Sequence, residues 1–142
     1  MRLLTAVLVC ITVFGSKARA QEAAPENLPA VVYVTPVTPP AIWEQIYHEV
    51  EQCLGHTGDF AGIRWFVTST AWRGPNGRAD GLWMARADGR RDIVVARGDT
   101  AVVRHEIVHD LLWHRGPHDE RAATSSEVHP VPPFGRCAKE YE

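Results

Sequence analysis

Prolines divide this sequence into a central region that can form regular structure and two flanks that are poorly suited to it. Five prolines lie between residues 21 and 40, and four more lie between residues 117 and 133. Proline has no backbone N–H and a fixed φ angle, so this density disfavours helices and central strands. We therefore expect no regular helix in residues 21–40, with residues 31–34 as one short strand there.

The first twenty residues have the layout of a secretory signal peptide. Arg2 precedes an apolar run from Leu3 to Phe14, and residues 18–20 (Ala-Arg-Ala) form a small-x-small cleavage site. The apolar run is shorter than the roughly 20 residues that a membrane-spanning helix needs. The sequence thus predicts a signal peptide at residues 1–20, a proline-rich segment at 21–40 and one domain at 41–142.

Removal of the signal peptide would change the charge of the chain. The 142 residues include 15 Lys and Arg against 17 Asp and Glu, a net charge of −2. Loss of Arg2, Lys17 and Arg19 leaves 12 basic residues against the same 17 acidic ones, a net charge of −5. Nucleic-acid binding depends on basic side chains that neutralise phosphates, so this charge gives no case for a nucleic-acid partner.

Two of the three cysteines, Cys53 and Cys137, lie outside the expected signal peptide. In an oxidising compartment, two cysteines most simply form one disulfide bond. In the chain-entropy model, a bond that closes a loop of about 84 residues stabilises a fold by on the order of 4 kcal/mol. Two separate buried thiols are the alternative.

The hydrophobic pattern predicts two helices. Residues 41–54 repeat apolar side chains at helical spacing, and Gly55 suits the end of that helix. Residues 101–115 show a second run of this kind, which Gly116 would end. The remaining tail, residues 116–142, is expected to be irregular.

The same pattern predicts a small sheet between the two helices. Residues 63–68 alternate apolar and polar side chains as a strand does. Residues 82–86 and 92–97 flank an Asp-Gly pair at 88–89, which is typical of a β-hairpin. The predicted fold class is therefore α+β, with a supporting helix, a small antiparallel sheet and a second helix packed beneath it.

The second predicted helix contains the motif His-Glu-Ile-Val-His at residues 105–109. Residues four apart lie on one face of a helix, so His105 and His109 can bind one metal ion, with zinc the expected one. Glu106 can then accept a proton from a water molecule that the metal activates. Asp110 could orient one histidine or lie in solvent. An amphipathic helix with two solvated histidines is the alternative interpretation.

A catalytic zinc ion usually has a third protein ligand, and the residues leave its identity open. The longer motif HExxHxxGxxH, which supplies a third histidine from the same segment, is absent. His118 follows the predicted helix end, where the chain could turn back. A disulfide at Cys137 would hold the segment that contains His129 against the core. Two carboxylates are further alternatives, Glu120 and Glu127.

Several residues around the motif occur in a characteristic order. They are residues 102–109 (VVRHEIVH), Leu111-Leu112, His129-Pro130 and Phe134-x-x-Cys137, preceded by Cys53-Leu54-Gly55 and Trp65. In this order the sequence resembles a group of small exported bacterial zincin-like metallopeptidases. In that group an HExxHxLL helix precedes a Gly-His-Pro segment and a terminal Phe-x-x-Cys.

The resemblance implies a zincin-like minimal core and a site made of specific residues. By position, the metal ligands would be His105, His109 and His129, with Glu106 as the catalytic acid/base. The sequence departs from the group in two places. Residues 113–128 resemble an insertion, and Glu127-Val128 stand where glycine is expected before His129, which keeps His118 as an alternative ligand.

These observations predict a secreted or periplasmic, zinc-dependent metallopeptidase. We expect a peptide or protein substrate in a shallow cleft, no nucleic acid, a monomer, and no membrane span once the signal peptide is removed. The alternative is a non-catalytic, disulfide-stabilised extracytoplasmic binding protein in which a metal is structural or absent. Glu106 distinguishes the two, because a binding protein has no need of a carboxylate beside the first histidine.

Overall fold

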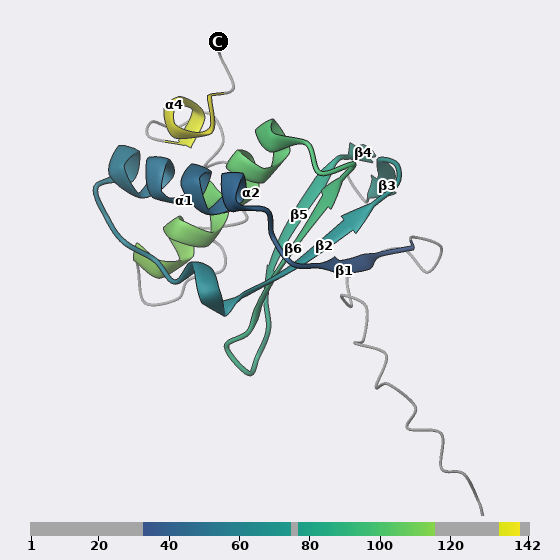
Figure 1. Cartoon of the computed structure of the whole chain (residues 1–142), viewed down its shortest axis with the longest axis horizontal. Coiled ribbons are helices and arrows are strands. Elements are labelled where there is room, and N and C mark those ends of the chain that lie inside the picture. Colours follow the sequence, from purple (N-terminus) through teal and green to yellow (C-terminus); the bar gives the residue numbers. More distant parts are fainter. Residues whose placement is uncertain (1–32, 75–76, 116–133, 140–142) are drawn as a thin grey trace, which may run out of the picture.

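Helices and a sheet pack face to face around one core, as Figure 1 shows. The computed structural model describes residues 33–74, 77–115 and 134–139. The long helices α1 (Ala41–Leu54) and α2 (Thr100–Arg115) confirm the two predicted helices. A one-turn helix, η1 (Phe60–Gly62), precedes the sheet, and a short helix, α4 (Phe134–Ala138), packs beside α1 and α2. The α+β fold class is thus confirmed.

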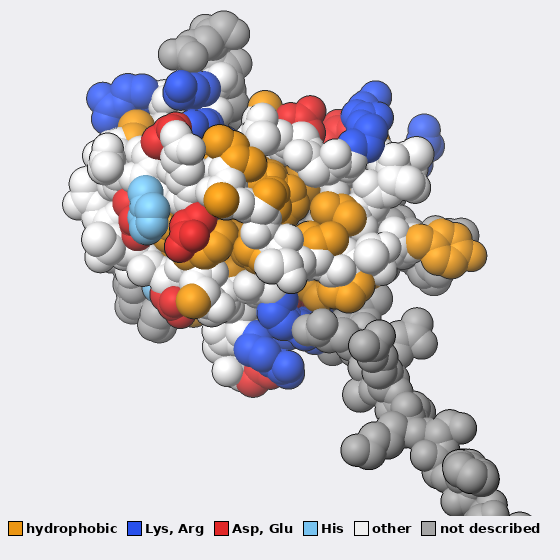
Figure 2. All heavy atoms as spheres, viewed as in Figure 1, with side chains coloured by type: hydrophobic (Ala, Val, Ile, Leu, Met, Phe, Trp, Pro, Cys, Tyr) orange, Lys and Arg blue, Asp and Glu red, His pale blue; other side chains and the backbone are white. Residues whose placement is uncertain are grey.

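The helix α1 forms because its apolar residues recur on one face. Trp43, Ile46, Tyr47 and Val50 are buried at spacings of three or four residues. The helix ends at Gly55, whose φ of 72° lies in the left-handed region that glycine adopts without strain. Figure 2 shows apolar side chains gathered across the centre of the same view, with an acidic side chain among them and basic side chains above and below.

The main sheet has four strands in the order β1-β2-β6-β5. They are β1 (Thr35–Val37), β2 (Ile63–Thr68), β5 (Gly81–Ala85) and β6 (Arg91–Ala96). A separate two-stranded ribbon, β3 (Trp72–Gly74) and β4 (Gly77–Ala79), lies between β2 and β5 in the sequence. The strand at 63–68 and the hairpin around Asp88-Gly89 are confirmed.

The predicted small antiparallel sheet is instead mixed: β1–β2 and β5–β6 are antiparallel, but β2 and β6 pair in parallel. The hairpin makes β6 antiparallel to β5, and β6 then inserts between β5 and β2. A parallel pair needs a crossover connection, which the ribbon and β5 provide here. Alternation of apolar residues indicates which face of a strand is buried, but it does not indicate the direction of the neighbouring strand.

Two short elements outside the long helices and the central strands differ from the prediction. In the first flank the strand is Thr35–Val37; residues 33–34 are not in a strand, and residues 31–32 lie outside the described residues. Pro36 is tolerated there because β1 is an edge strand of the sheet. In the tail, residues 134–138 form α4, where an irregular chain was expected.

The predicted disulfide bond joins α4 to α1. The Sγ atoms of Cys53 and Cys137 are 2.05 Å apart and their Cα atoms 5.7 Å apart. Cys137 is buried, as are its neighbours Phe134 and Ala138. The short helix α4 is therefore tied to the core both by a covalent bond and by apolar packing.

Residues 1–32, which include the expected signal peptide, lie outside the described residues. In the part of the chain that is described, no helix combines the length and apolar composition that crossing a bilayer requires.

Candidate active site

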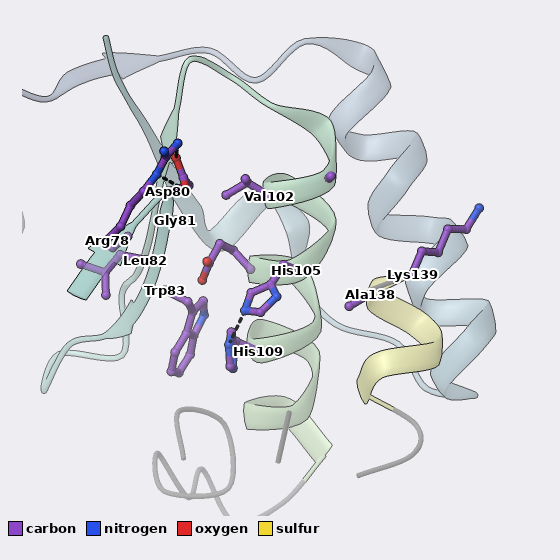
Figure 3. Close-up of a pocket in the computed structure, with 13 residues that line it drawn as sticks. Arg78, Asp80, Gly81, Leu82, Trp83, Val102, His105, His109, Ala138 and Lys139 are labelled. Carbon is purple, nitrogen blue, oxygen red and sulfur yellow. Dashed lines mark hydrogen bonds and ion pairs between the residues drawn. The ribbon is translucent and has the colours of Figure 1, made fainter. Parts of the chain in front are cut away.

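The motif residues of α2 face a cavity of about 560 Å³ between that helix and β5 (Figure 3). His105, Glu106 and His109 all line it. Trp83 lies across from the histidines on the other wall. The remaining lining residues come from the segment before and along β5, from the first turn of α2 and from the end of α4: Arg78, Ala79, Asp80, Gly81, Leu82, Ala101, Val102, Ala138 and Lys139.

The two histidines of the motif point toward each other. Their Nε2 atoms are 3.2 Å apart, and their ring centroids are separated by 5.0 Å. His109 is buried, with 6% of its surface exposed, and His105 is half-buried. His109 is therefore not a solvated side chain, whereas His105 stays partly exposed at the cavity, and the two Nε2 atoms converge on one point.

Glu106 lies beside this pair and is nearly buried, with 5% of its surface exposed. Burial raises the pKa of its carboxyl group to about 8, since a carboxylate loses hydration there. A hydrogen bond that the carboxylate accepts from the backbone N–H of Trp83 acts in the opposite direction. The carboxyl group is thus oriented by β5, and its burial favours the neutral form.

The strand β5 presents an open edge next to Glu106. The Asp80 carbonyl accepts a hydrogen bond from the Ala96 N–H, and the Arg86 N–H donates to the Arg90 carbonyl. Since backbone groups alternate along an antiparallel pair, the backbone groups of residues 81, 83 and 85 point away from β6. This edge is unpaired within the described sheets, because β5 is the last strand in its order.

Gly81 allows the Glu106 carboxylate to approach this edge. A Cβ atom at position 81 would lie inside van der Waals distance of Glu106 Oε1 and 2.5 Å from Val102 Cγ1. Both contacts are too short for real atoms, so a side chain here would have to displace Glu106. The absence of a side chain at residue 81 is therefore part of the site, which local sequence patterns do not reveal.

A buried polar cluster lies behind the motif. The Asp110 carboxylate is fully buried and accepts hydrogen bonds from Tyr47 Oη at 2.9 Å, Trp83 Nε1 at 3.0 Å and Arg91 Nη1 at 2.9 Å. Burial raises the pKa of Asp110, while the Arg91 guanidinium opposes that shift. The solvated interpretation of Asp110 is wrong, because this side chain links α2 to α1, β5 and β6.

The structure leaves the third ligand open. His118, His129, Glu120 and Glu127 lie outside the described residues. Among residues 33–74, 77–115 and 134–139, no group of three or more His, Cys, Asp or Glu side chains could hold a metal ion. At the cavity, the described part of the chain therefore supplies the imidazoles of His105 and His109, with the Glu106 carboxylate beside them.

Comparison with protein-family models, with curated proteins and with solved structures finds no match to this chain. The similarity to zincin-like metallopeptidases remains an expectation from the sequence.

Proposed function

We propose that this protein is a zinc-dependent peptidase whose active site is the cavity between α2 and β5. The supporting observation is the 3.2 Å separation of the Nε2 atoms of His105 and His109, with Glu106 next to them. Two nitrogens that bind one tetrahedral zinc ion at about 2.05 Å lie about 3.3 Å apart. The donor type and the spacing of the pair both fit zinc, and His129 or His118 would be the third ligand.

The roles of the chain's own groups follow from their positions. When bound, a zinc ion would polarise the scissile carbonyl group and make water more acidic. Glu106 accepts a proton from the attacking water and returns it to the leaving amine, as a general acid/base does. The Trp83 N–H keeps the carboxylate aimed into the cavity during both transfers.

The open edge of β5 suits an extended peptide as substrate. An extended chain can add to a sheet edge through backbone hydrogen bonds, and here the backbone groups of Gly81 and Ala85 point outward. Leu82, Trp83 and Val102 give the cavity apolar walls for side chains. We propose a secreted or periplasmic location, since a disulfide bond persists in an oxidising compartment.

Metal analysis of the purified protein tests this function. We expect about one zinc ion per chain in the wild type and a loss of affinity of at least about 100-fold after His109→Ala, because one of the donors is removed. His48→Ala is the matched control, since His48 is exposed on α1 and lies outside the cavity. A wild type without zinc affinity, or equal binding by both variants, would contradict the proposal.

Gly81→Ala should lower kcat/KM for peptide hydrolysis by about 100-fold, because a displacement of about 1 Å in a catalytic group has an effect of this size. The added methyl group collides with Glu106 Oε1. Zinc content and hydrolysis of a fluorogenic peptide are measured together.

Gly89→Ala is the control for this substitution. Gly89 has a φ of 81° in the hairpin turn, and nothing lies within 4 Å of a Cβ built there. This variant therefore carries backbone strain without touching the cavity, and it should retain activity when folded. Full activity of folded Gly81→Ala would show that Glu106 does not depend on this edge.

A further inference from the structure

The short helix α4 contacts the histidine pair directly. Its first residue, Phe134, is 1% exposed, and its ring centroid lies 5.1 Å from that of His105 and 4.8 Å from that of His109. The ring of Phe134 therefore forms a wall against both imidazoles. At the other end of α4, Ala138 and Lys139 line the cavity (Figure 3).

The position of α4 depends on its attachments. A helix of five residues is too short to be stable by its own hydrogen bonds. Its covalent attachment to the core is the bond between Cys137 and Cys53 of α1, only three residues after Phe134. The helix α1 is in turn anchored by its four buried core residues. The disulfide thus connects a rigid part of the core to the wall behind the histidines.

We propose that the Cys53–Cys137 disulfide sets the metal affinity of the His105–His109 pair by holding Phe134 against both rings. This inference rests on the proposed metal site. Metal binding needs both imidazoles in the rotamers that bring their Nε2 atoms together, and freely rotating side chains lose entropy when they adopt them. Phe134 restricts both rings before the metal arrives, so part of that entropy is already lost in the folded protein.

Zinc affinity of the disulfide-free protein tests this link. The dissociation constant is measured with zinc alone, by competition with a chromophoric chelator, for the wild type and the Cys53→Ser/Cys137→Ser double variant. We expect binding to weaken about 10- to 100-fold, the effect typical of groups that orient metal ligands. Serine avoids new thiolate ligands, and circular dichroism confirms that the variant is folded at the temperature used.

Phe134→Leu tests the same link with the disulfide intact. Leucine leaves a gap beside both imidazoles, so we expect a loss of zinc affinity similar to that of the disulfide-free variant. Phe60→Leu is the matched control, because Phe60 packs on Tyr47 and Trp65, at 5.4 and 5.5 Å between centroids, and does not line the cavity. Equal zinc affinity of wild type and Phe134→Leu would overturn the inference.

The combined variant shows whether the disulfide acts through Phe134. If it does, adding Phe134→Leu to the Cys53→Ser/Cys137→Ser variant weakens zinc binding no further, because the contact of Phe134 with the two imidazoles is already lost. If the fold-losses in zinc affinity of the two variants multiply, the disulfide and Phe134 act independently, and the inference is overturned. A wild type that binds no zinc contradicts the proposed function itself, whereas tight binding that survives all of these substitutions contradicts only the role of the disulfide.

Discussion

Replacement of Glu106 by Gln is expected to lower kcat for peptide hydrolysis by about 10²- to 10⁴-fold, the usual contribution of a general acid/base. The Gln side chain has the shape of the carboxyl group, and its amide oxygen can still accept a hydrogen bond from the Trp83 N–H. The amide cannot, however, take up a proton from water. Zinc content should stay that of the wild type, because Glu106 is not one of the proposed ligands. Steady-state kinetics with a fluorogenic peptide and metal analysis measure the two quantities.

Glu49→Gln is the matched control for this substitution. Glu49 lies on α1, outside the cavity, where it pairs with Arg104. The control should keep full activity. If Glu106→Gln binds zinc and hydrolyses peptides as fast as the wild type, Glu106 is not the base. If the wild type binds zinc and hydrolyses no peptide, the non-catalytic binding protein becomes the better interpretation.

Asp110→Ala is expected to destabilise the fold by about 3–5 kcal/mol, the range for removal of one partner of a buried ion pair. Arg91, which is 2% exposed, would lose its buried carboxylate partner at 2.9 Å and keep the Asp59 carboxylate, which is 62% exposed and 3.3 Å away. Tyr47 and Trp83 would each lose a hydrogen-bond acceptor. This is a large part of the 5–15 kcal/mol that stabilises a typical domain. Urea unfolding followed by tryptophan fluorescence measures the change.

Asp88→Ala shows how much of this effect comes from burial. Asp88 also pairs with an arginine, Arg90, but both side chains are about half exposed in the hairpin turn. Water can solvate the remaining charge there, so the change in unfolding free energy should be far smaller. Comparable losses in the two variants would show that burial of the Arg91–Asp110 pair does not govern its contribution.

Local patterns in the sequence predicted the parts of the fold that depend on neighbours in the chain. The spacing of Ile42, Ile46 and Val50 predicts α1, although Ile42 is exposed and Trp43 beside it is buried instead. Asp88-Gly89 predicts the hairpin. The parallel pairing of β2 with β6 was missed, because it is set by how distant segments pack. The helix α4 was missed because five residues carry no periodic signal and depend on tertiary attachments.

The same distinction holds for the site. His105 and His109 are four residues apart on one helix, so their convergence could be predicted from spacing alone. Gly81 lies 24 residues before the motif and Phe134 lies 25 residues after it, and only the packing of β5 and α4 on α2 brings them there. A glycine at the start of a strand and a phenylalanine in a proline-rich tail give no local sign of these roles.

The order of these parts along the chain has a consequence for when activity can begin. The strand β6 fills the place between β2 and β5, so a growing chain cannot complete its sheet before residue 96 has been made. Cys53 then has to meet Cys137, 84 residues later, before α4 is fastened beside the histidines. Under the proposed function, a nascent chain carries no finished peptidase, and a late oxidation step separates synthesis from the ability to cut other chains.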